Sequence, residues 1–214
     1  MDAHQQIWNE RVARKIIEAL QGRRMEGSYA ATAQQAGREV LAMIPRGSTV
    51  YRCGSMTVTG MGLWEEITAI PGVRVIDPYQ PGLSAEEAIN LRREGLLADV
   101  MVSSVNAVTL DGKLVNLDGM GNRVAAMIFG PRKVILVVGM NKVAADLEAA
   151  MARVKHYASP VNAIRLNRDT PCVKTGLCAD CRSAQRICNL WSIIEGHAIP
   201  NRIHVKLVGE SLGY

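Results

Sequence analysis

The chain has 214 residues, of which 48% are hydrophobic and 21% are charged, and its formal net charge is +5. These values predict one globular domain with a sizeable core. The basic residues are scattered and aromatic residues are only 4% of the chain, so we expect no nucleic-acid partner and favour a solvated surface or attraction to an anionic ligand.

The N-terminal segment, MDAHQQIWNERVARK, is polar and amphipathic and lacks the apolar centre of a signal peptide. No run reaches the roughly 18 apolar residues that a membrane span needs. We therefore expect a cytoplasmic protein with no membrane span. In that reducing compartment, clustered cysteines more often bind a metal than pair as disulfides.

Residues 1–44 predict a helical N-terminal layer. Apolar residues recur at near-helical spacing from Ile7 to Leu20, and a second helix is expected from Ser28 to Met43, just before Pro45.

Strands and helices then alternate through residues 45–158, which predicts an α/β fold with a mainly parallel sheet and flanking helices. The expected strands are Thr49–Arg52, Val73–Ile76, Val100–Val105 and Lys133–Val138. The expected helices are Val58–Ile67, Ser84–Leu97 with a capping box, a short one after Gly121, and Val143–Tyr157. Asp111 and Gly112 predict a hairpin within residues 108–116.

Residues 159–214 are expected to form a cysteine-rich flap and a closing strand. Four of the five cysteines follow the spacing C-x5-C-x2-C-x6-C, namely Cys172, Cys178, Cys181 and Cys188. The two-residue gap in this pattern lets two thiolates reach one metal centre from a single turn. Four thiolates are a full ligand set for tetrahedral zinc or for a 4Fe–4S cluster.

Two structural disulfides and singly buried thiols are the alternatives to a metal. The reducing setting argues against disulfides, and the crowding of four cysteines argues against isolated core thiols. The spacing matches neither the usual ferredoxin run nor a paired zinc ribbon, so spacing alone leaves iron–sulfur and zinc open. The closing strand, Arg202–Val208, alternates apolar and polar residues, which predicts a half-exposed strand near a sheet edge with His204 on the surface.

In an open α/β sheet, ligands bind at the carboxyl ends of the strands, and three loops qualify. Residues 53–57 offer a glycine and hydroxyls before a helix, although the same residues also make a good helix cap. Residues 103–123 crowd polar groups beside glycines beyond what turn chemistry requires. Residues 139–142 add a lysine that would neutralise an anion, with a cap at Asn141 as the simpler interpretation. The substrate-binding candidates are Gly54, Ser55, Thr57, Asn106, Asn116, Asp118, Asn122, Arg123 and Lys142. No residue is singled out as catalytic.

Four stretches resemble the lactate-utilisation (LUD-domain) family. They are Gly54–Thr57, ADVMVSSVNAVTLDG at 98–112, NLDGMGNR at 116–123 and GPRKVI at 130–135. The likeness extends over nearly the whole chain, which is treated as a single LUD-like domain. It implies a fold similar to the sugar-isomerase and CoA-transferase group, and some members assist L-lactate oxidation alongside iron–sulfur partner subunits.

The four-cysteine insertion looks like that of a subgroup in which the cysteines hold a cluster, which favours iron–sulfur over zinc. The resemblance therefore implies an iron–sulfur protein that acts in oxidation or electron transfer of a small 2-hydroxy acid such as lactate, with iron–sulfur redox partner subunits. Two alternatives stay open: a non-redox enzyme or binding module for a small anion (a sugar phosphate or a CoA ester) with a structural zinc, and an accessory subunit of a dehydrogenase complex. The role of Cys53 and a homodimer are also left open.

Overall fold

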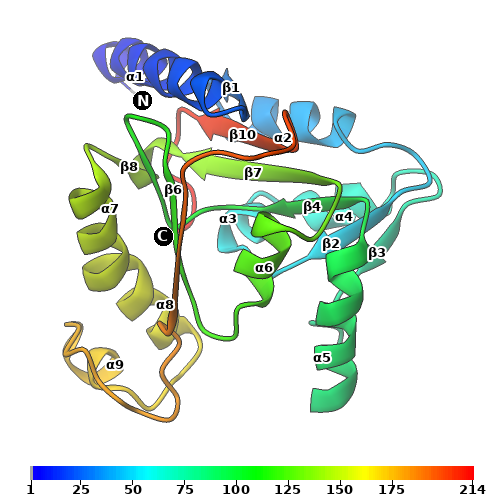
Figure 1. Ribbon diagram of the computed structural model, residues 1–214, viewed down its shortest axis with the longest axis vertical. Helices are drawn as coiled ribbons and strands as arrows, with labels where there is room; N and C mark the ends of the chain where they lie inside the picture. Colours follow the sequence, from blue (N-terminus) through cyan, green and yellow to red (C-terminus); the bar gives the residue numbers. More distant parts are fainter. Residues whose placement is uncertain (1) are drawn as a thin grey trace.

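The protein is described by a computed structural model over residues 2–214 (Figure 1). At its centre is a six-stranded sheet in the order β1-β10-β7-β4-β2-β3, with every neighbouring pair parallel. The strands are β1 (Glu26–Ala30), β10 (Ile203–Val208), β7 (Lys133–Gly139), β4 (Val100–Ser103), β2 (Thr49–Arg52) and β3 (Arg74–Ile76). The expected α/β class with a mainly parallel sheet and flanking helices is confirmed.

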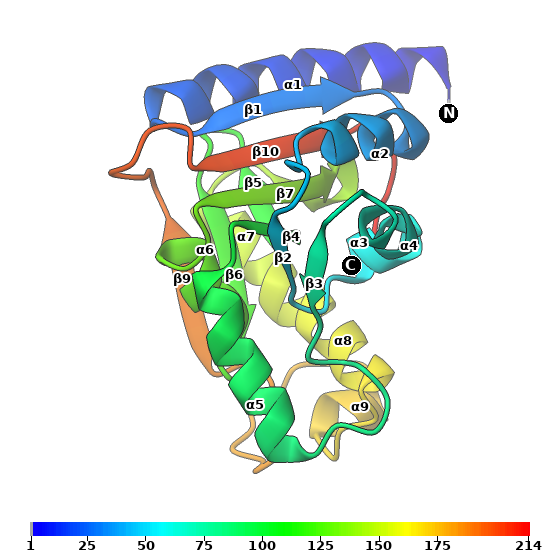
Figure 2. The same ribbon diagram turned by 90° about the vertical axis from the view of Figure 1, so that its right-hand side faces the viewer.

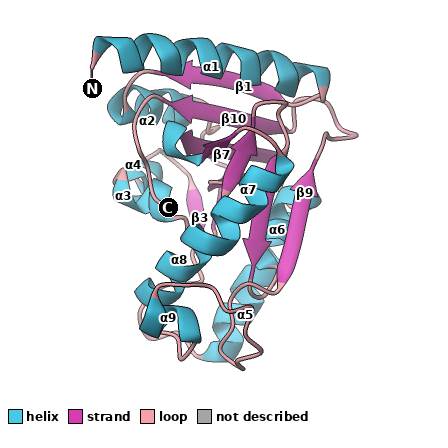
Figure 3. Cartoon of the chain, turned by 90° about the vertical axis from the view of Figure 1, so that its left-hand side faces the viewer, coloured by secondary structure: helices cyan, strands magenta, loops and turns pink. Residues whose placement is uncertain are grey.

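A second, smaller sheet has the order β8-β5-β6-β9. Its strands are β8 (Val143–Ala144), β5 (Ala107–Thr109), β6 (Leu114–Asp118) and β9 (Leu190–Ile194). The predicted hairpin is confirmed, because β5 and β6 pair antiparallel and Gly112 supplies a positive φ of 84° in the turn. Strand β9 lies along β6, so the chain returns from the cysteine segment beside the hairpin (Figure 3).

Helices cover both faces of the large sheet. The helices are α1 (Ala3–Gly22), α2 (Ala33–Ala42), α3 (Met56–Gly60), α4 (Leu63–Thr68), α5 (Ala85–Glu94), α6 (Asn122–Ile128), α7 (Leu147–Arg153), α8 (Ser159–Arg165) and α9 (Pro171–Thr175). Short helical turns occupy Gly95–Leu97, Met140–Lys142 and Val154–Ala158, and the last of these is a π-helical segment between α7 and α8.

Two apolar layers hold the sheet between its helices. On one face, α2, α3 and α4 pack Val40, Val58 and Ile67 against the buried strand residues of β2, β4 and β7. On the other face, α1 lies along β1 and β10 (Figure 2) and packs Ile16 and Leu20 into a core shared with the hairpin. Burial of this apolar surface is the main term that stabilises the fold.

The N-terminal layer differs from the prediction. Residues 26–30 form strand β1, whereas we expected the second helix to begin at Ser28; the helix begins at Ala33 instead. Thr32 caps it by accepting a hydrogen bond from the Gln35 backbone N–H at 3.2 Å. A five-residue strand that pairs on one side only carries a weak period-2 signal, which explains the error.

The closing strand is also more buried than predicted. All six residues of β10 are buried because β1 pairs with one edge, β7 with the other, and helices cover the faces. The prediction that His204 lies on the surface is wrong: the side chain is 8% exposed and sits between Glu26 and Ser28. Lys206 is 1% exposed and donates to Glu39.

Two predicted helices are shorter than expected. Gly62, with a positive φ of 69°, separates α3 from α4 within the stretch expected as one helix. Residues 143–144 form β8, so the following helix begins only at Leu147, capped by Asp146. The capping box of Ser84 and Glu87 is confirmed. Within residues 2–214, no helix is both long and apolar enough to cross a membrane.

Candidate functional site

A cleft of about 510 Å³ opens where β2, β3, β4 and β7 end. The strand order changes direction between β2 and β4, the position at which open α/β sheets usually bind ligands. Of the nine residues predicted to bind substrate, all but Asn116 line this cleft. The fold therefore brings together three loops that are far apart in the sequence.

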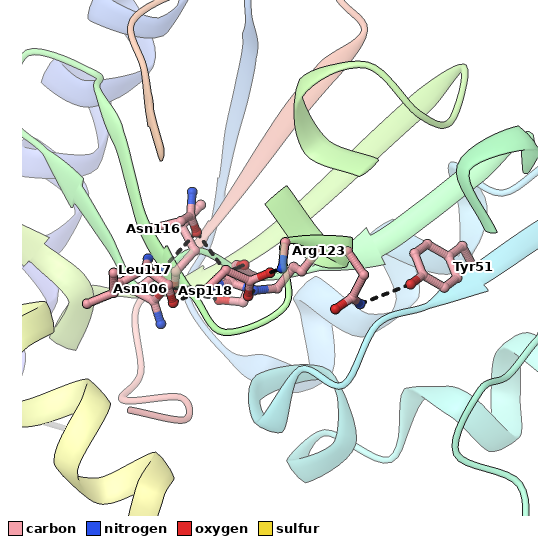
Figure 4. A network of polar contacts seen from close by, with 10 residues as sticks. Tyr51, Asn106, Asn116, Leu117, Asp118 and Arg123 are labelled. Atoms are coloured by element: carbon pink, nitrogen blue, oxygen red, sulfur yellow. Dashed lines mark hydrogen bonds and ion pairs between the residues drawn. The ribbon is translucent and has the colours of Figure 1, made fainter. Parts of the chain in front are cut away.

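Hydrogen bonds from Arg123 connect the polar side chains of residues 103–123 (Figure 4). The Arg123 guanidinium donates to Asp118 at 3.2 Å, to the Asn116 side-chain oxygen at 2.8 Å and to the Asn106 side-chain oxygen at 2.9 Å. It also donates to the Ser104 and Leu117 carbonyls. These side chains bind one another, so they shape one wall of the cleft.

Asn116 lies behind this wall rather than in it. The side chain is fully buried, and its oxygen accepts from Arg123 and from the Asn106 backbone N–H. Its amide nitrogen has no hydrogen-bond partner among residues 2–214. The Asn122 amide donates to the Tyr51 hydroxyl at 3.1 Å.

The loop after β2 places Gly54, Ser55 and Thr57 on the opposite side of the cleft. Gly54 has a positive φ of 76°, and a Cβ there would come within 2.5 Å of the Tyr79 hydroxyl. Ser55 caps α3 by accepting from the Val58 backbone N–H. Cys53 is 4% exposed, and burial raises the pKa of its thiol to about 12, so it is a neutral thiol near pH 7.

The cleft is strongly cationic. The basic residues that line it are Arg52, Arg92, Arg123, Lys142, Arg165 and Arg168. Asp118 is the one acidic side chain among the lining residues that the structure describes, and Arg123 already pairs with it. A concave site with this excess of positive charge favours an anionic ligand.

Lys142 occupies the floor of the cleft and is 3% exposed. Its Nζ lies 2.8 Å from the Thr57 hydroxyl and 2.9 Å from the Ser104 hydroxyl. Burial, together with the positive charges of Arg153 and Arg123, lowers the pKa of the Lys142 ammonium from 10.5 to about 7. The site therefore holds a lysine that changes its charge near neutral pH.

A second, smaller cavity of about 20 Å³ is lined by Cys172, Cys178, Cys181 and Cys188 together. All five cysteines of the chain are free thiols. Arg186 donates to the backbone carbonyls of Cys181 and Cys188 and so links these two parts of the cysteine segment. Ile187 lines both this cavity and the cationic cleft, and α8 contributes Asn162 and Arg165 to the cleft and Pro160 and Ala163 to the cavity, so the two are neighbours.

The cysteine segment is anchored to the π-helical turn that follows α7. Lys155 from that turn pairs with Asp180 at 2.6 Å, and Asp180 also pairs with Arg186. Burial raises the pKa of the Cys188 thiol, while the charges of Arg186 and Lys155 oppose the rise. Positive charge beside the thiols is the environment that thiolate ligands require.

The donor set of this cavity suits a thiolate-bound metal centre. Within residues 2–214, no three Cys, His, Asp or Glu side chains already stand close enough together to hold a metal ion. Cys178, Cys181 and Cys188 lie in residues 176–189, which contain neither helix nor strand, and Cys172 lies in α9. By their chemistry the residues fit a zinc ion or an iron–sulfur cluster; the cavity as it stands is smaller than a cluster.

Several cleft residues were not predicted. Arg52, Tyr79 and Arg92 come from the ends of β2, β3 and α5, and Arg165 and Arg168 approach from the other side with α8. Arg52 lies over the Trp64 ring and pairs with Asp77, and Arg92 lies over Tyr79. No local sequence pattern distinguishes these residues from the other arginines and tyrosines of the chain.

The fold and the cleft define a class: an α/β protein with a cationic ligand site at the carboxyl edge of a parallel sheet. The model of the LUD domain matches residues 13–208, so the chain belongs to the LUD-domain family. Family membership supports a role related to lactate utilisation. The likeness predicted from the sequence is thereby confirmed.

Among solved structures, the chain is similar to a DUF162 family protein from Deinococcus radiodurans. The two share 15% sequence identity with a TM-score of 0.52, and the match covers 94% of this chain and 98% of that one. At this identity the likeness supports the fold. No curated protein matches the chain.

Proposed function

We propose that the protein binds a small 2-hydroxy acid such as lactate in the cationic cleft, and that Cys172, Cys178, Cys181 and Cys188 hold a 4Fe–4S cluster beside it. The observation that carries the proposal is that all four cysteines line one cavity, and that Ile187 belongs to both this cavity and the cleft. An electron acceptor is useful only close to the molecule it oxidises.

The charge of the cleft supports a carboxylate ligand. Arg165 and Arg168 are exposed at its rim and have no carboxylate partner among residues 2–214, so they are available to an incoming anion. The Arg123 network holds the wall against which the ligand would rest, and Lys142 supplies the floor. Arginine is well suited to this task because its planar donors match a carboxylate.

Oxidation of a 2-hydroxy acid to a 2-oxo acid releases two electrons and two protons. A 4Fe–4S cluster, when bound, supplies a one-electron path, so an iron–sulfur partner subunit that accepts the electrons in turn belongs to the proposal. The chain's own residues would bind and orient the carboxylate, and Lys142 in its neutral form would be able to accept a proton.

A structural zinc ion is the second candidate for the cysteines. The small size of the cavity, about 20 Å³, favours a single ion, because a zinc ion is smaller than a cluster. In that case the cleft would serve a non-redox enzyme or a binding module for a small anion.

Metal and sulfide analysis of protein purified without oxygen separates these candidates. We expect about four iron and four sulfide per chain, with a brown colour. The variant Cys178→Ser should lose this content, whereas Cys53→Ser, which changes the buried thiol outside the cysteine cavity, should keep it. Colourless protein with one zinc per chain and no sulfide would contradict the proposal.

A further inference from the structure

The hydrogen bonds around Lys142 determine which of its neighbours donate and which accept. The Thr57 hydroxyl donates to the Leu212 carbonyl at 3.3 Å, and the Ser104 hydroxyl donates to the Val105 carbonyl at 3.2 Å. Each hydroxyl has one proton, so both must accept from the Lys142 Nζ. Two of the Nζ hydrogens are therefore committed to these two oxygens.

A tetrahedral amine nitrogen has four directions. At Lys142, one direction is the bond to its own side chain and two carry the hydrogens donated to Thr57 and Ser104. The fourth carries the lone pair when the amine is neutral and a third hydrogen when it is charged. Because Lys142 lines the cleft, this fourth direction is available to a ligand there.

The surroundings of Lys142 favour the neutral amine. The charged groups that face it are Arg123 from α6 and Arg153 from α7, both positive, and no carboxylate pairs with it among residues 2–214. The C-terminal tail covers it: a Cβ on Gly213 would lie 3.4 Å from Nζ. A buried lysine beside other cations and away from carboxylates is the arrangement that makes a lysine nucleophilic near neutral pH.

We propose that Lys142 is a nucleophile that forms an imine with the carbonyl group of a small 2-oxo acid bound in the cleft. The choice of ligand rests on the proposed function, in which the cleft holds a small carboxylate, and a 2-oxo acid is the oxidised form of a 2-hydroxy acid. The carboxylate of such a ligand is attracted to the basic residues that line the cleft, and its carbonyl carbon is the atom that the Lys142 amine attacks.

The step balances without an oxidant or a reductant. The Nζ lone pair forms a bond to the carbonyl carbon, and the electrons of the carbonyl double bond move to its oxygen. That oxygen takes up protons and leaves as water while nitrogen loses its two hydrogens. The Thr57 and Ser104 hydroxyls accept from Nζ and so hold the amine in place during this step. The products are one imine and one water.

Borohydride trapping tests this inference. The purified full chain is incubated with pyruvate, reduced with sodium borohydride and digested, and the peptides are analysed by mass spectrometry. We expect one reduced adduct, located on Lys142. Lactate, which has the carboxylate but no carbonyl, should form no adduct and should compete with pyruvate.

Two variants complete the test. Lys142→Arg keeps a cation but forms no imine, so it should give no adduct, and its circular dichroism spectrum should match that of the unchanged protein. Lys15→Arg, on the exposed face of α1, should give the same adduct as the unchanged protein. Pyruvate that binds without trapping, or an adduct on another lysine, would overturn the imine and leave the proposed binding intact. Absence of both pyruvate and lactate binding would overturn the proposed function as well.

Discussion

The Arg123 network and the cysteine segment adjoin each other, since the Asn189 N–H donates to the Asp118 carbonyl at 2.9 Å, and they differ in how far their polar groups are paired. In the network, one guanidinium satisfies three side chains and two carbonyls, and the Arg123 and Asp118 side chains are each 13% exposed. In the cysteine segment, four half-buried thiols line one cavity; Cys172 contacts the Thr170 hydroxyl at 3.2 Å, and Arg186 hydrogen-bonds to Cys188. The Arg123 network therefore satisfies most of its polar groups within the chain, whereas the cysteine segment contributes four free thiols to one small cavity.

The largest expected effect is on the Arg123 network. Replacement of Arg123 by Ala leaves Asp118, Asn106 and Asn116 without their shared donor, which we expect to lower the free energy of unfolding by about 3–5 kcal/mol. Urea unfolding at neutral pH measures this value. The matched variant Arg123→Lys keeps the charge but not the planar set of donors. Its free energy of unfolding should lie between those of the unchanged protein and Arg123→Ala. A loss below about 1 kcal/mol for Arg123→Ala would mean that the network does not stabilise the wall.

Lys142 gives the next effect, which depends on pH. Its pKa in the folded protein, about 7, is below the ordinary value of 10.5, so the unfolded chain binds more protons between these two pH values. Stability relative to Lys142→Met should therefore rise with pH across this window, by about 1.4 kcal/mol for each pH unit inside it. Parallel urea titrations of both proteins from pH 6 to pH 10 measure the difference. A difference that stays constant with pH would show that the lysine is charged throughout.

The smallest effect is expected in the cysteine segment when no metal is bound. In metal-free protein, Cys178→Ser should change the free energy of unfolding by no more than about 0.5 kcal/mol, because the thiol has no partner there. In metal-loaded protein the same change should be strongly destabilising, since a centre that binds only the folded chain adds to its stability. Thermal melts with and without the metal compare the two conditions. An equal loss in both would mean that Cys178 is an ordinary packing residue.

Patterns that depend on neighbours in the sequence predicted much of this molecule. Local sequence patterns predict the strands at 49–52, 100–103 and 133–139. The loops after these strands lie at one edge of the sheet because parallel strands end together. The candidates in residues 103–123 were found because the polar groups exceed what turns need. That these groups bind one another could not be foreseen, because Arg123 meets Asn106 only once β5 and β6 have paired.

The missed features depend on contacts between distant segments. Strand β10 was predicted to be half-exposed because apolar and polar residues alternate along it. In the fold β1 pairs with its edge, and His204 and Lys206 have Glu26 and Glu39 beside them. The low pKa of Lys142 arises from burial and from the positive charges of Arg153 in α7 and Arg123 in α6, which come together only in the folded chain. Burial of a single charged residue leaves no mark on local sequence.

The account depends most on the two cavities acting as one site. Electron paramagnetic resonance of the reduced protein, prepared without oxygen and measured with and without lactate, tests this directly. We expect an iron–sulfur signal whose shape changes when lactate is added, because the cysteine cavity and the cleft are neighbours that share Ile187 in their linings. An iron–sulfur signal that saturating lactate leaves unchanged, or reduced protein with zinc and no such signal, would contradict the account.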